Sequence, residues 1–202
     1  MERPALLPDS ARRLVLGSTS PYRRELLARL RLDFDVVAPD VDETPLAGER
    51  PDALATRLAQ AKAAAVARQH PLAVVIGSDQ VADLAGEPLG KPGNHARATE
   101  QLCRMRGRTV LFQTAVCVVC LDAGFRQQEL ATVRVRFREL TNAEIERYLQ
   151  AEQPFDCAGS ARSEGLGIAL LESIDSDDPT ALVGLPLIRT CRMLRSAGIR
   201  VP

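Results

Sequence analysis

A short polar stretch near the start of the chain carries side chains suited to binding an anion. Its three hydroxyl groups and two guanidinium groups belong to Ser18, Thr19, Ser20, Arg23 and Arg24. The apolar residues before Gly17 predict a strand, and Pro21 opens an apolar-periodic helix that Ser20 would cap. The N–H groups of a helix N-terminus and nearby guanidinium groups attract phosphate. We therefore expect a polyphosphate at this loop, with solvated surface arginines as the alternative.

The two lysines of the chain are conspicuous because arginine supplies the other 24 of its 26 basic residues. A lysine ammonium is a compact, rotatable charge, so a lysine retained in such a chain favours a role on a phosphate. Lys62 lies one turn after Leu58, on the edge of an apolar helical stripe, and its ammonium can reach a cleft. Lys91 lies in a predicted loop. Chance placement and a snorkelling surface lysine are the alternatives.

Two carboxylates lie where a catalytic or metal-binding acid is expected. Asp79 follows the apolar run 72–77, which predicts a buried central strand, and ligands gather at the carboxyl ends of such strands. Glu43 belongs to an acidic loop that is either a solvated turn or a source of hard oxygen ligands for magnesium. Asp79 can accept a proton from water, or hold a metal that acidifies the water.

Strand and helix patterns along the chain predict the elements that position these residues. Expected strands cover 14–17, 34–37, 72–77, 81–84, 109–121, 129–137 and 168–174. Expected helices start near Pro21, Pro51, Asn94, Thr141 and Leu185. The last helix is expected to face the core with Leu185, Leu187, Ile188, Cys191 and Leu194. The glycine-rich stretch 160–167 predicts a loop whose backbone approaches a ligand closely.

Composition argues against several classes of protein. The 26 basic and 26 acidic residues give a formal net charge of zero, so no broad electrostatic field is expected to attract the chain to nucleic acid or to an acidic membrane. Arginines alternate with apolar residues over 133–138, which predicts a solvated sheet face more than a nucleic-acid surface. The chain has two histidines, so a histidine-based zinc site or a Ser-His-Asp hydrolase is not expected.

The ends and the cysteines of the chain predict a cytoplasmic location. Residues 1–12 have the character of a loose terminus without the layout of a signal peptide, and no run of about 18 apolar residues occurs. The five cysteines match no disulfide framework and predict reduced thiols. Cys117 and Cys120 lie three residues apart in a predicted strand, so their side chains point to opposite faces and a shared metal is not expected.

Taken together, these segments resemble the Maf family of nucleoside triphosphate pyrophosphatases over nearly the whole chain. The matching motifs are 17–24, 41–44, 58–63, 77–80, 90–92, 158–160 and 183–186. The resemblance implies one domain over residues 1–202, with a Maf/ITPase-like α/β fold: a mixed twisted sheet, flanking helices and two lobes around a central cleft. It also implies hydrolysis of a nucleoside triphosphate between its α and β phosphorus atoms, a divalent cation such as Mg²⁺ or Mn²⁺, and a homodimer.

Within this family, the branch that acts on 7-methyl-GTP is the most similar, through the motifs 78–80 and 163–165. The branch for dTTP and UTP is expected to carry threonine after the aspartate, arginine after the proline and glutamine in the later loop. This chain has Gln80, Tyr22 and Glu164 at those positions. Tyr22 also stands where the 7-methyl-GTP branch is expected to carry tryptophan, although both side chains are flat aromatics.

The resemblance and the residue chemistry together imply roles in catalysis and phosphate binding. Asp79 would be the general base and, with Glu43, would hold the metal. The phosphate-binding residues would be Ser18, Arg23, Arg24, Lys62 and Lys91. Arg24 is expected to contribute least, because adjacent helical residues point about 100° apart.

The base of the nucleotide would be read by three further side chains. Tyr22 would stack on the cationic 7-methylguanine ring, Glu164 would accept its N–H donors, and Gln80 would add an amide contact. Such an enzyme would limit the incorporation of modified nucleotides into nucleic acids. The alternatives are a dTTP/UTP pyrophosphatase, or a regulatory nucleotide-binding protein with little turnover, for example in cell-division arrest.

Overall fold

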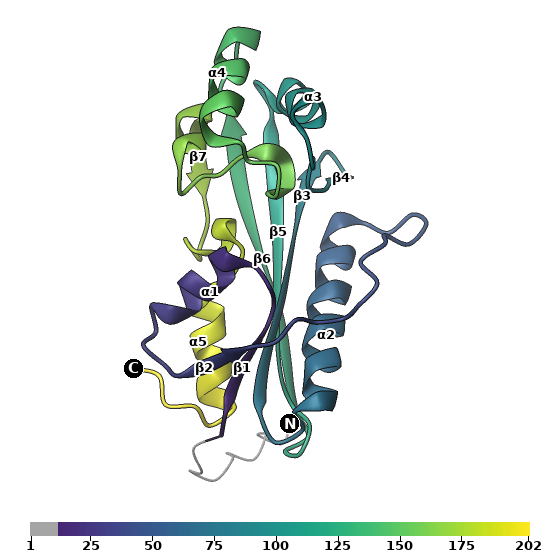
Figure 1. Ribbon diagram of the computed structural model, residues 1–202, viewed down its shortest axis with the longest axis vertical. Helices are drawn as coiled ribbons and strands as arrows, with labels where there is room; N and C mark the ends of the chain where they lie inside the picture. The colour runs from purple at the N-terminus through teal and green to yellow at the C-terminus, as the bar shows by residue number, and fades with distance from the viewer. Residues whose placement is uncertain (1–11) are drawn as a thin grey trace.

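The computed structural model describes residues 12–202, and in this part of the chain seven strands form one mixed sheet (Figure 1). The strands are β1 (Leu14–Gly17), β2 (Phe34–Val36), β3 (Val74–Leu84), β4 (Glu87–Leu89), β5 (Thr109–Cys120), β6 (Phe125–Phe137) and β7 (Leu171–Asp175). Their order is β2-β1-β3-β5-β6-β7, and β4 pairs with β3. β1 is parallel to both neighbours, and the other pairs are antiparallel. The predicted loose terminus lies, except for Arg12, outside the described residues.

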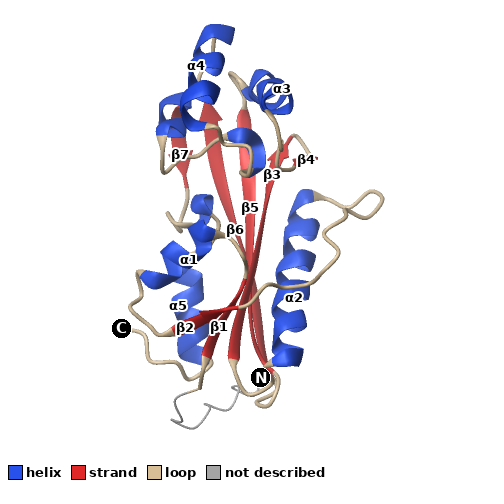
Figure 2. Ribbon diagram, in the orientation of Figure 1, coloured by secondary structure: helices blue, strands red, loops and turns tan. Residues whose placement is uncertain are grey.

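Helices flank this sheet on both faces, which confirms the predicted α/β class (Figure 2). The α-helices are α1 (Pro21–Ala28), α2 (Pro51–Gln69), α3 (His95–Met105), α4 (Asn142–Glu152) and α5 (Leu187–Ser196). α1 and α5 lie together on the opposite side of the sheet from α2, and α3 and α4 lie at the other end of the long strands (Figure 1). Across residues 12–202, no helix has the length and apolar character needed to cross a membrane.

Side-chain caps fix the starts of three helices where the sequence predicts them. The side chains of Ser20, Asn94 and Thr141 each accept a hydrogen bond from the N–H of the third residue beyond them. Glu144 completes a capping box by accepting from the N–H of Thr141. These starts depend on local chemistry alone, which is why sequence pattern locates them.

β3 is one continuous strand of 11 residues, which corrects the prediction of two strands broken at 78–80. β1 ends at Gly17, opposite Gly77, but β5 pairs with β3 as far as Asp83. The antiparallel hydrogen bonds to β5 therefore keep 78–80 extended despite their polar side chains. Asp79 consequently lies in the middle of β3, just beyond the point where β1 has ended, and not at the end of its own strand.

β5 and β6 form a hairpin from the two predicted strands, although β6 begins at Phe125 and not at residue 129. Its first residues pair with the end of β5, and this pairing extends the strand. The predicted alternation of buried apolar residues and outward arginines over 133–137 is confirmed. Cys117 and Cys120 belong to core clusters on opposite faces of the sheet, as their spacing predicts.

Clusters of buried side chains divide the molecule into two lobes. In one lobe, α3 and α4 pack against the far ends of the long strands, around residues such as Leu102 and Leu149. In the other lobe, α1 and α5 bury Leu26 and Met193 on one face of the sheet, and α2 buries Leu58 on the opposite face. β3, β5 and β6 run through both lobes (Figure 1).

The C-terminal part of the chain departs from prediction in two places. The buried side chains of α5 are Thr190, Met193 and Leu194, whereas Ile188 is 53% exposed. Residues 188 and 190 lie about 200° apart around a helix, so both cannot face the core. The strand predicted over 168–174 begins only at Leu171, because a 3-10 turn occupies Leu166–Leu170 within the stretch predicted as loop and strand.

Gly77 allows α2 to pack very close to β3. A Cβ atom added at this position would lie 2.5 Å from the Ala59 carbonyl oxygen and equally near the backbone nitrogen of Ala63. Both atoms belong to the backbone of α2, so they cannot rotate away. A side chain at residue 77 would therefore push α2, and Lys62 with it, away from the sheet.

We expect the substitution Gly77→Ala to lower the free energy of unfolding by at least about 2 kcal/mol, as overpacking does in a tightly packed core. Chemical denaturation measures this value. The matched control is Gly90→Ala, because a Cβ at Gly90 meets no atom within 4 Å. Equal stability of the two variants would show that α2 is not held as closely as described.

Candidate functional site

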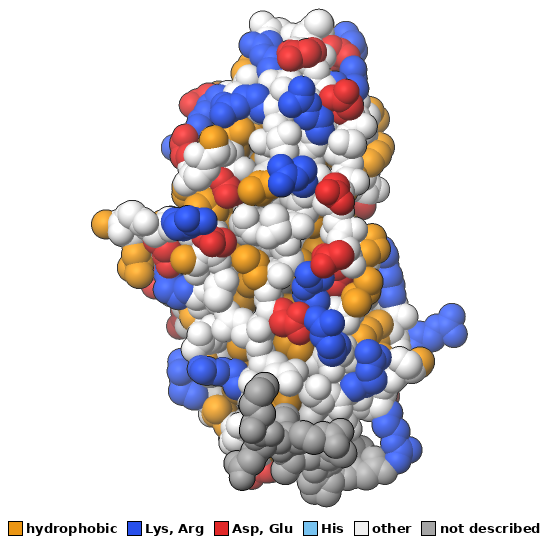
Figure 3. Space-filling model, turned by 180° about the vertical axis from the view of Figure 1, so that it is seen from behind, with side chains coloured by type: hydrophobic (Ala, Val, Ile, Leu, Met, Phe, Trp, Pro, Cys, Tyr) orange, Lys and Arg blue, Asp and Glu red, His pale blue; other side chains and the backbone are white. Residues whose placement is uncertain are grey.

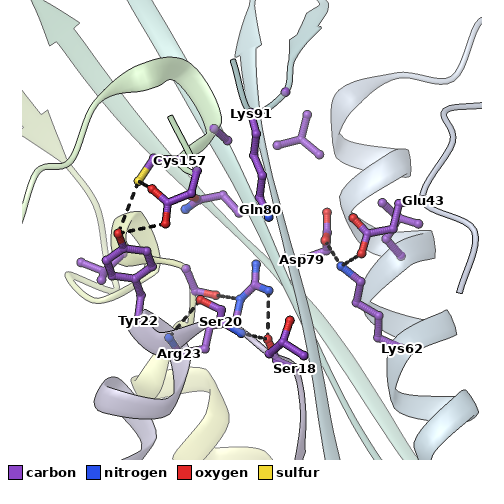
Figure 4. A pocket seen from close by; sticks show the side chains of 18 of the residues that line it. Ser18, Ser20, Tyr22, Arg23, Glu43, Lys62, Asp79, Gln80, Lys91 and Cys157 are labelled. Atoms are coloured by element: carbon purple, nitrogen blue, oxygen red, sulfur yellow. Dashed lines mark hydrogen bonds and ion pairs between the residues drawn. The ribbon is translucent and has the colours of Figure 1, made fainter. Parts of the chain in front are cut away.

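A cavity of about 510 Å³ lies between the two lobes, within the size range of small-molecule sites. Nine of the ten residues that the sequence predicts for a site line it, and they come from segments far apart in the chain (Figure 4). These residues are Ser18, Tyr22, Arg23, Glu43, Lys62, Asp79, Gln80, Lys91 and Glu164.

Arg24 is the predicted site residue that does not line this cavity. It borders a separate hollow with Pro21 and Glu25 on the outer side of α1. Arg23 and Arg24 point about 100° apart on the helix, so α1 can turn only one of them toward the cleft. Arg23 is the one that lines the cavity, and Arg24 lies away from the other cations.

Lys62 joins the two predicted metal-binding carboxylates. Its Nζ lies 2.6 Å from Asp79 Oδ1 and 2.7 Å from Glu43 Oε1 (Figure 4). The side chains of Lys62 and Asp79 are only 6% and 10% exposed, while that of Glu43 is 57% exposed. Partial burial opposes ionisation of Glu43, but the hydrogen bond and charge of Lys62 outweigh burial and lower the pKa of that carboxyl. Lys62 therefore holds the carboxyl groups of Glu43 and Asp79 together in one cluster.

Arg23 and Ser18 form the floor of the cavity on the β1 side. Arg23 Nε donates to the Gly184 carbonyl oxygen at 2.8 Å, and its Nη1 donates to Ser18 Oγ at 3.4 Å. Burial lowers the pKa of Arg23, and the nearby charges of Asp79 and Glu43 act against that shift. A guanidinium keeps its proton in proteins, so Arg23 supplies a fixed positive charge directed by two hydrogen bonds.

Lys91 approaches the same cavity from the opposite lobe. It follows β4, and its side chain extends toward the space above Asp79 (Figure 4). Both lysines of the chain therefore border one cavity, as the sequence predicts. Lys62, Lys91 and Arg23 surround it from three directions, which suits a ligand with several negative charges.

The side-chain amide nitrogen of Gln80 donates its hydrogen bonds within the protein. Its Nε2 donates to the carbonyl oxygens of Ala181 and Leu182 and to Thr114 Oγ1, at 2.9, 3.0 and 2.9 Å. Gln80 therefore holds the 3-10 turn Ala181–Val183 that precedes Gly184, the residue whose carbonyl oxygen orients Arg23. A contact from Gln80 to a ligand would have to use its carbonyl oxygen.

Tyr22 and Glu164 both line the cavity, from different segments of the chain. Tyr22 is on α1, and Glu164 is an exposed side chain on the segment between two 3-10 turns, Ala158–Ser160 and Leu166–Leu170. Sequence reasoning missed three polar residues beside Tyr22, namely Asp156, Cys157 and Arg162. The one available signal was Tyr22 itself, because a tyrosine needs partners for a hydroxyl that tryptophan lacks.

The carboxylates of this cleft fit a divalent cation that is shared with a ligand. Within residues 12–202, no three His, Cys, Asp or Glu side chains are grouped to hold a metal by themselves. Magnesium is commonly bound by one or two carboxylates, with phosphate oxygens and waters completing its shell. Glu43 and Asp79 supply two such carboxylates beside a cationic rim. The arrangement can therefore bind a phosphorylated compound together with a divalent cation.

Comparison with known proteins identifies the family of this chain. A family model described as Maf-like protein matches residues 13–197. The chain belongs to the Maf family. A Polaromonas sp. protein named 7-methyl-GTP pyrophosphatase is 74% identical over 195 residues, which cover 96% of this chain and 89% of the relative. A protein of the same name from Albidiferax ferrireducens is 70% identical, with 94% and 96% covered. Another such Maf protein, from Cupriavidus pinatubonensis, is 61% identical, with 92% and 94% covered.

We expect Lys62→Met in this Maf protein to lower the free energy of unfolding by about 3–5 kcal/mol, because the buried Asp79 carboxylate loses its partner. Chemical denaturation at neutral pH measures the change. The control is Arg50→Met, which breaks the exposed pair with Asp52 and should cost less than about 1 kcal/mol. A loss at Lys62 no larger than the loss at Arg50 would contradict a buried, shared ion pair.

Proposed function

We propose that this Maf protein hydrolyses 7-methyl-GTP to 7-methyl-GMP and pyrophosphate. The observation that carries the proposal is the single cleft in which Arg23, Lys62 and Lys91 surround the carboxylates of Asp79 and Glu43. A triphosphate matches the cations, and a carboxylate beside it can act as the general base of a hydrolytic reaction. The names of the relatives, which are 61–74% identical, support the choice of base.

Asp79 is the residue that we assign as general base. Its Oδ1 accepts from Lys62, so Oδ2 is the oxygen that would take a proton from the attacking water. The water oxygen forms a new bond to the α phosphorus. The bond from the α phosphorus to the oxygen that bridges it to the β phosphorus breaks, and pyrophosphate leaves with that bridging oxygen. Arg23, Lys62 and Lys91 would stabilise the negative charge that grows on the departing pyrophosphate.

Glu43 and Asp79 are the residues that would hold a divalent cation, Mg²⁺ or Mn²⁺. When bound, such an ion polarises phosphate oxygens and makes a water molecule more acidic. Ser18 and the N-terminal N–H groups of α1 would donate to the phosphates on the opposite side of the cleft. The charge of the triphosphate would thus be neutralised from both lobes.

The base would be recognised at the mouth of the cleft. 7-Methylguanine carries a delocalised positive charge and N–H donors on its Watson–Crick edge. Glu164 can accept those donors and oppose that charge, while the ring of Tyr22 can stack on a cationic base. A thymine ring is uncharged and offers Glu164 a single imide donor. These contacts favour 7-methyl-GTP over dTTP and UTP.

The chain would act in the cytoplasm as a homodimer and would keep 7-methylated nucleotides out of nucleic acids. Nucleic acid and membranes are not expected as partners. On the face seen in Figure 3, basic and acidic side chains are interspersed. Two arginines near the end of β6 pair with acids: Arg136 with Glu172, and Arg138 with Glu144. Sedimentation analysis would report the oligomeric state.

We expect the protein, assayed with magnesium or manganese, to release pyrophosphate from 7-methyl-GTP far faster than from GTP, dTTP or UTP. Asp79→Asn should lower kcat by about 10²–10⁴-fold, the usual effect of losing a general base. Asp83→Asn is the matched control, because Asp83 is on the same strand but accepts a hydrogen bond from Gly86 N–H outside the cleft. Binding without pyrophosphate release would favour a regulatory nucleotide-binding protein instead.

We expect Glu164→Gln to raise KM for 7-methyl-GTP by about tenfold or more, since a hydrogen bond to a charged group contributes about 1.5–3 kcal/mol. KM for GTP should change much less, so the preference for the methylated base falls. Glu172→Gln on β7 is the control, because Glu172 pairs with Arg136 on the outer sheet surface. Undiminished preference in Glu164→Gln would remove Glu164 from base recognition.

A further inference from the structure

Arg162 links the two sides of the cleft mouth. Its Nη2 donates to the Tyr22 hydroxyl and lies 3.4 Å from Asp156 Oδ1, and its Nη1 donates to Glu152 Oε1 at 2.9 Å. Its guanidinium carbon lies over the Tyr22 ring, 5.2 Å from the ring centroid. Tyr22 belongs to α1 in one lobe, whereas Glu152 ends α4 in the other. One side chain therefore connects elements that pack in separate cores.

Arg162 also begins the segment that carries Glu164, residues 162–166, which we call the specificity loop. Glu152 is the common anchor, because its Oε1 accepts from Arg162 and its Oε2 accepts from the N–H of Leu166 at 2.9 Å. A Cβ at Gly165 would lie 2.7 Å from Glu152 Oε1, so the loop packs directly on this carboxylate. Glu164 lies between the two anchored ends.

The hydroxyl of Tyr22 is what makes this link possible. It accepts from Arg162 and lies 3.3 Å from Asp156 Oδ2, to which it can donate. Burial is the largest cause that raises the pKa of Tyr22, so the phenol keeps its proton at neutral pH. A tryptophan ring has an N–H donor and no acceptor, so it could not receive the guanidinium N–H. The link depends on tyrosine at residue 22.

We propose that Arg162 is a positioning residue that determines base specificity by holding Tyr22 and the specificity loop in one arrangement. The inference rests on the proposed function, because Tyr22 and Glu164 matter together only if they contact the same base. The guanidinium bonds to the Tyr22 hydroxyl and lies 5.2 Å from the ring centroid, so it fixes the direction of the ring on which a base would stack. Within residues 12–202, Arg162 forms hydrogen bonds and ion pairs with Tyr22, Tyr148, Glu152 and Asp156 and with no proposed phosphate-binding residue, so its effect falls on recognition of the base.

The test is a double-mutant cycle on Tyr22→Phe and Arg162→Gln. Tyr22→Phe keeps the ring and removes only the hydroxyl, and Arg162→Gln removes the guanidinium. Each variant should raise KM for 7-methyl-GTP by about tenfold, the loss expected for one charge-assisted hydrogen bond. The double variant should be no worse than Arg162→Gln alone, because Tyr22→Phe removes a bond that Arg162→Gln has already removed. Calorimetric titration with 7-methyl-GMP, without metal, should give the same pattern in Kd.

Two further variants separate positioning from a structural role. Arg162→Lys should fall between the natural protein and Arg162→Gln, because an ammonium offers its donors from a single nitrogen and cannot reproduce the planar fork whose two nitrogens reach Tyr22 and Glu152. Arg136→Gln, on an exposed arginine that pairs with Glu172, should leave KM and Kd unchanged. A lower Tm for Arg162→Gln with unchanged KM and Kd would overturn the proposal, because Arg162 would then stabilise the fold without affecting recognition of the base.

Additive losses of binding free energy in the double-mutant cycle would also overturn the proposal, since Tyr22 and Arg162 would then act independently. Failure of the proposed function gives a different result, namely a natural protein that does not prefer 7-methyl-GTP. The cycle would then be measured with the nucleotide of the panel that is hydrolysed fastest. Subadditive changes in its KM would support positioning by Arg162, and additive changes would refute it.

Discussion

The Lys62 ammonium bonds to two carboxylates from different parts of the chain, one in a loop and one in the middle of β3. A buried charge is stable only when partners replace its lost hydration. To reach Asp79, α2 must lie very close to β3, and Gly77 leaves the space for this contact. β1 must also stop at Gly17, so that the sheet opens beside Asp79. The packing of α2 and the length of β1 thus follow from the same requirement.

Charge is distributed differently in the cleft and on the outer surface. Both lysines border the cleft, where Arg23 joins them and Glu43 and Asp79 oppose them. Many arginines elsewhere pair with neighbouring acids, as Arg57 does with Glu49, whose pKa falls to about 2 mainly through that hydrogen bond. The neutral total charge of the chain therefore conceals one cleft in which three cations and several carboxylates are gathered, an arrangement suited to a polyphosphate bound together with a divalent cation.

Local chemistry made much of this structure predictable from sequence. Capping side chains located the helix starts, and the types of Arg23, Lys62 and Asp79 indicated a phosphate site before their contacts were known. Pairing between distant segments was not predictable: 78–80 stay extended because β5 lies beside them. Orientation around a helix decided that Arg23 faces the cleft and Arg24 does not. The contact between Arg162 and Tyr22 joins residues 140 positions apart, and neither residue alone indicates it.

The long strands shared by both lobes limit how the cleft can move. β3, β5 and β6 pass through the two cores without interruption, so in the described part of the chain the lobes share one sheet and are not separated by a flexible linker. Hinge rotation of one lobe against the other would break strand pairing. A ligand would therefore enter the cleft through movements of the loops at its rim and small changes in sheet twist. Such a scaffold is preorganised, so a ligand that enters it orders few additional backbone residues and loses little affinity to conformational entropy.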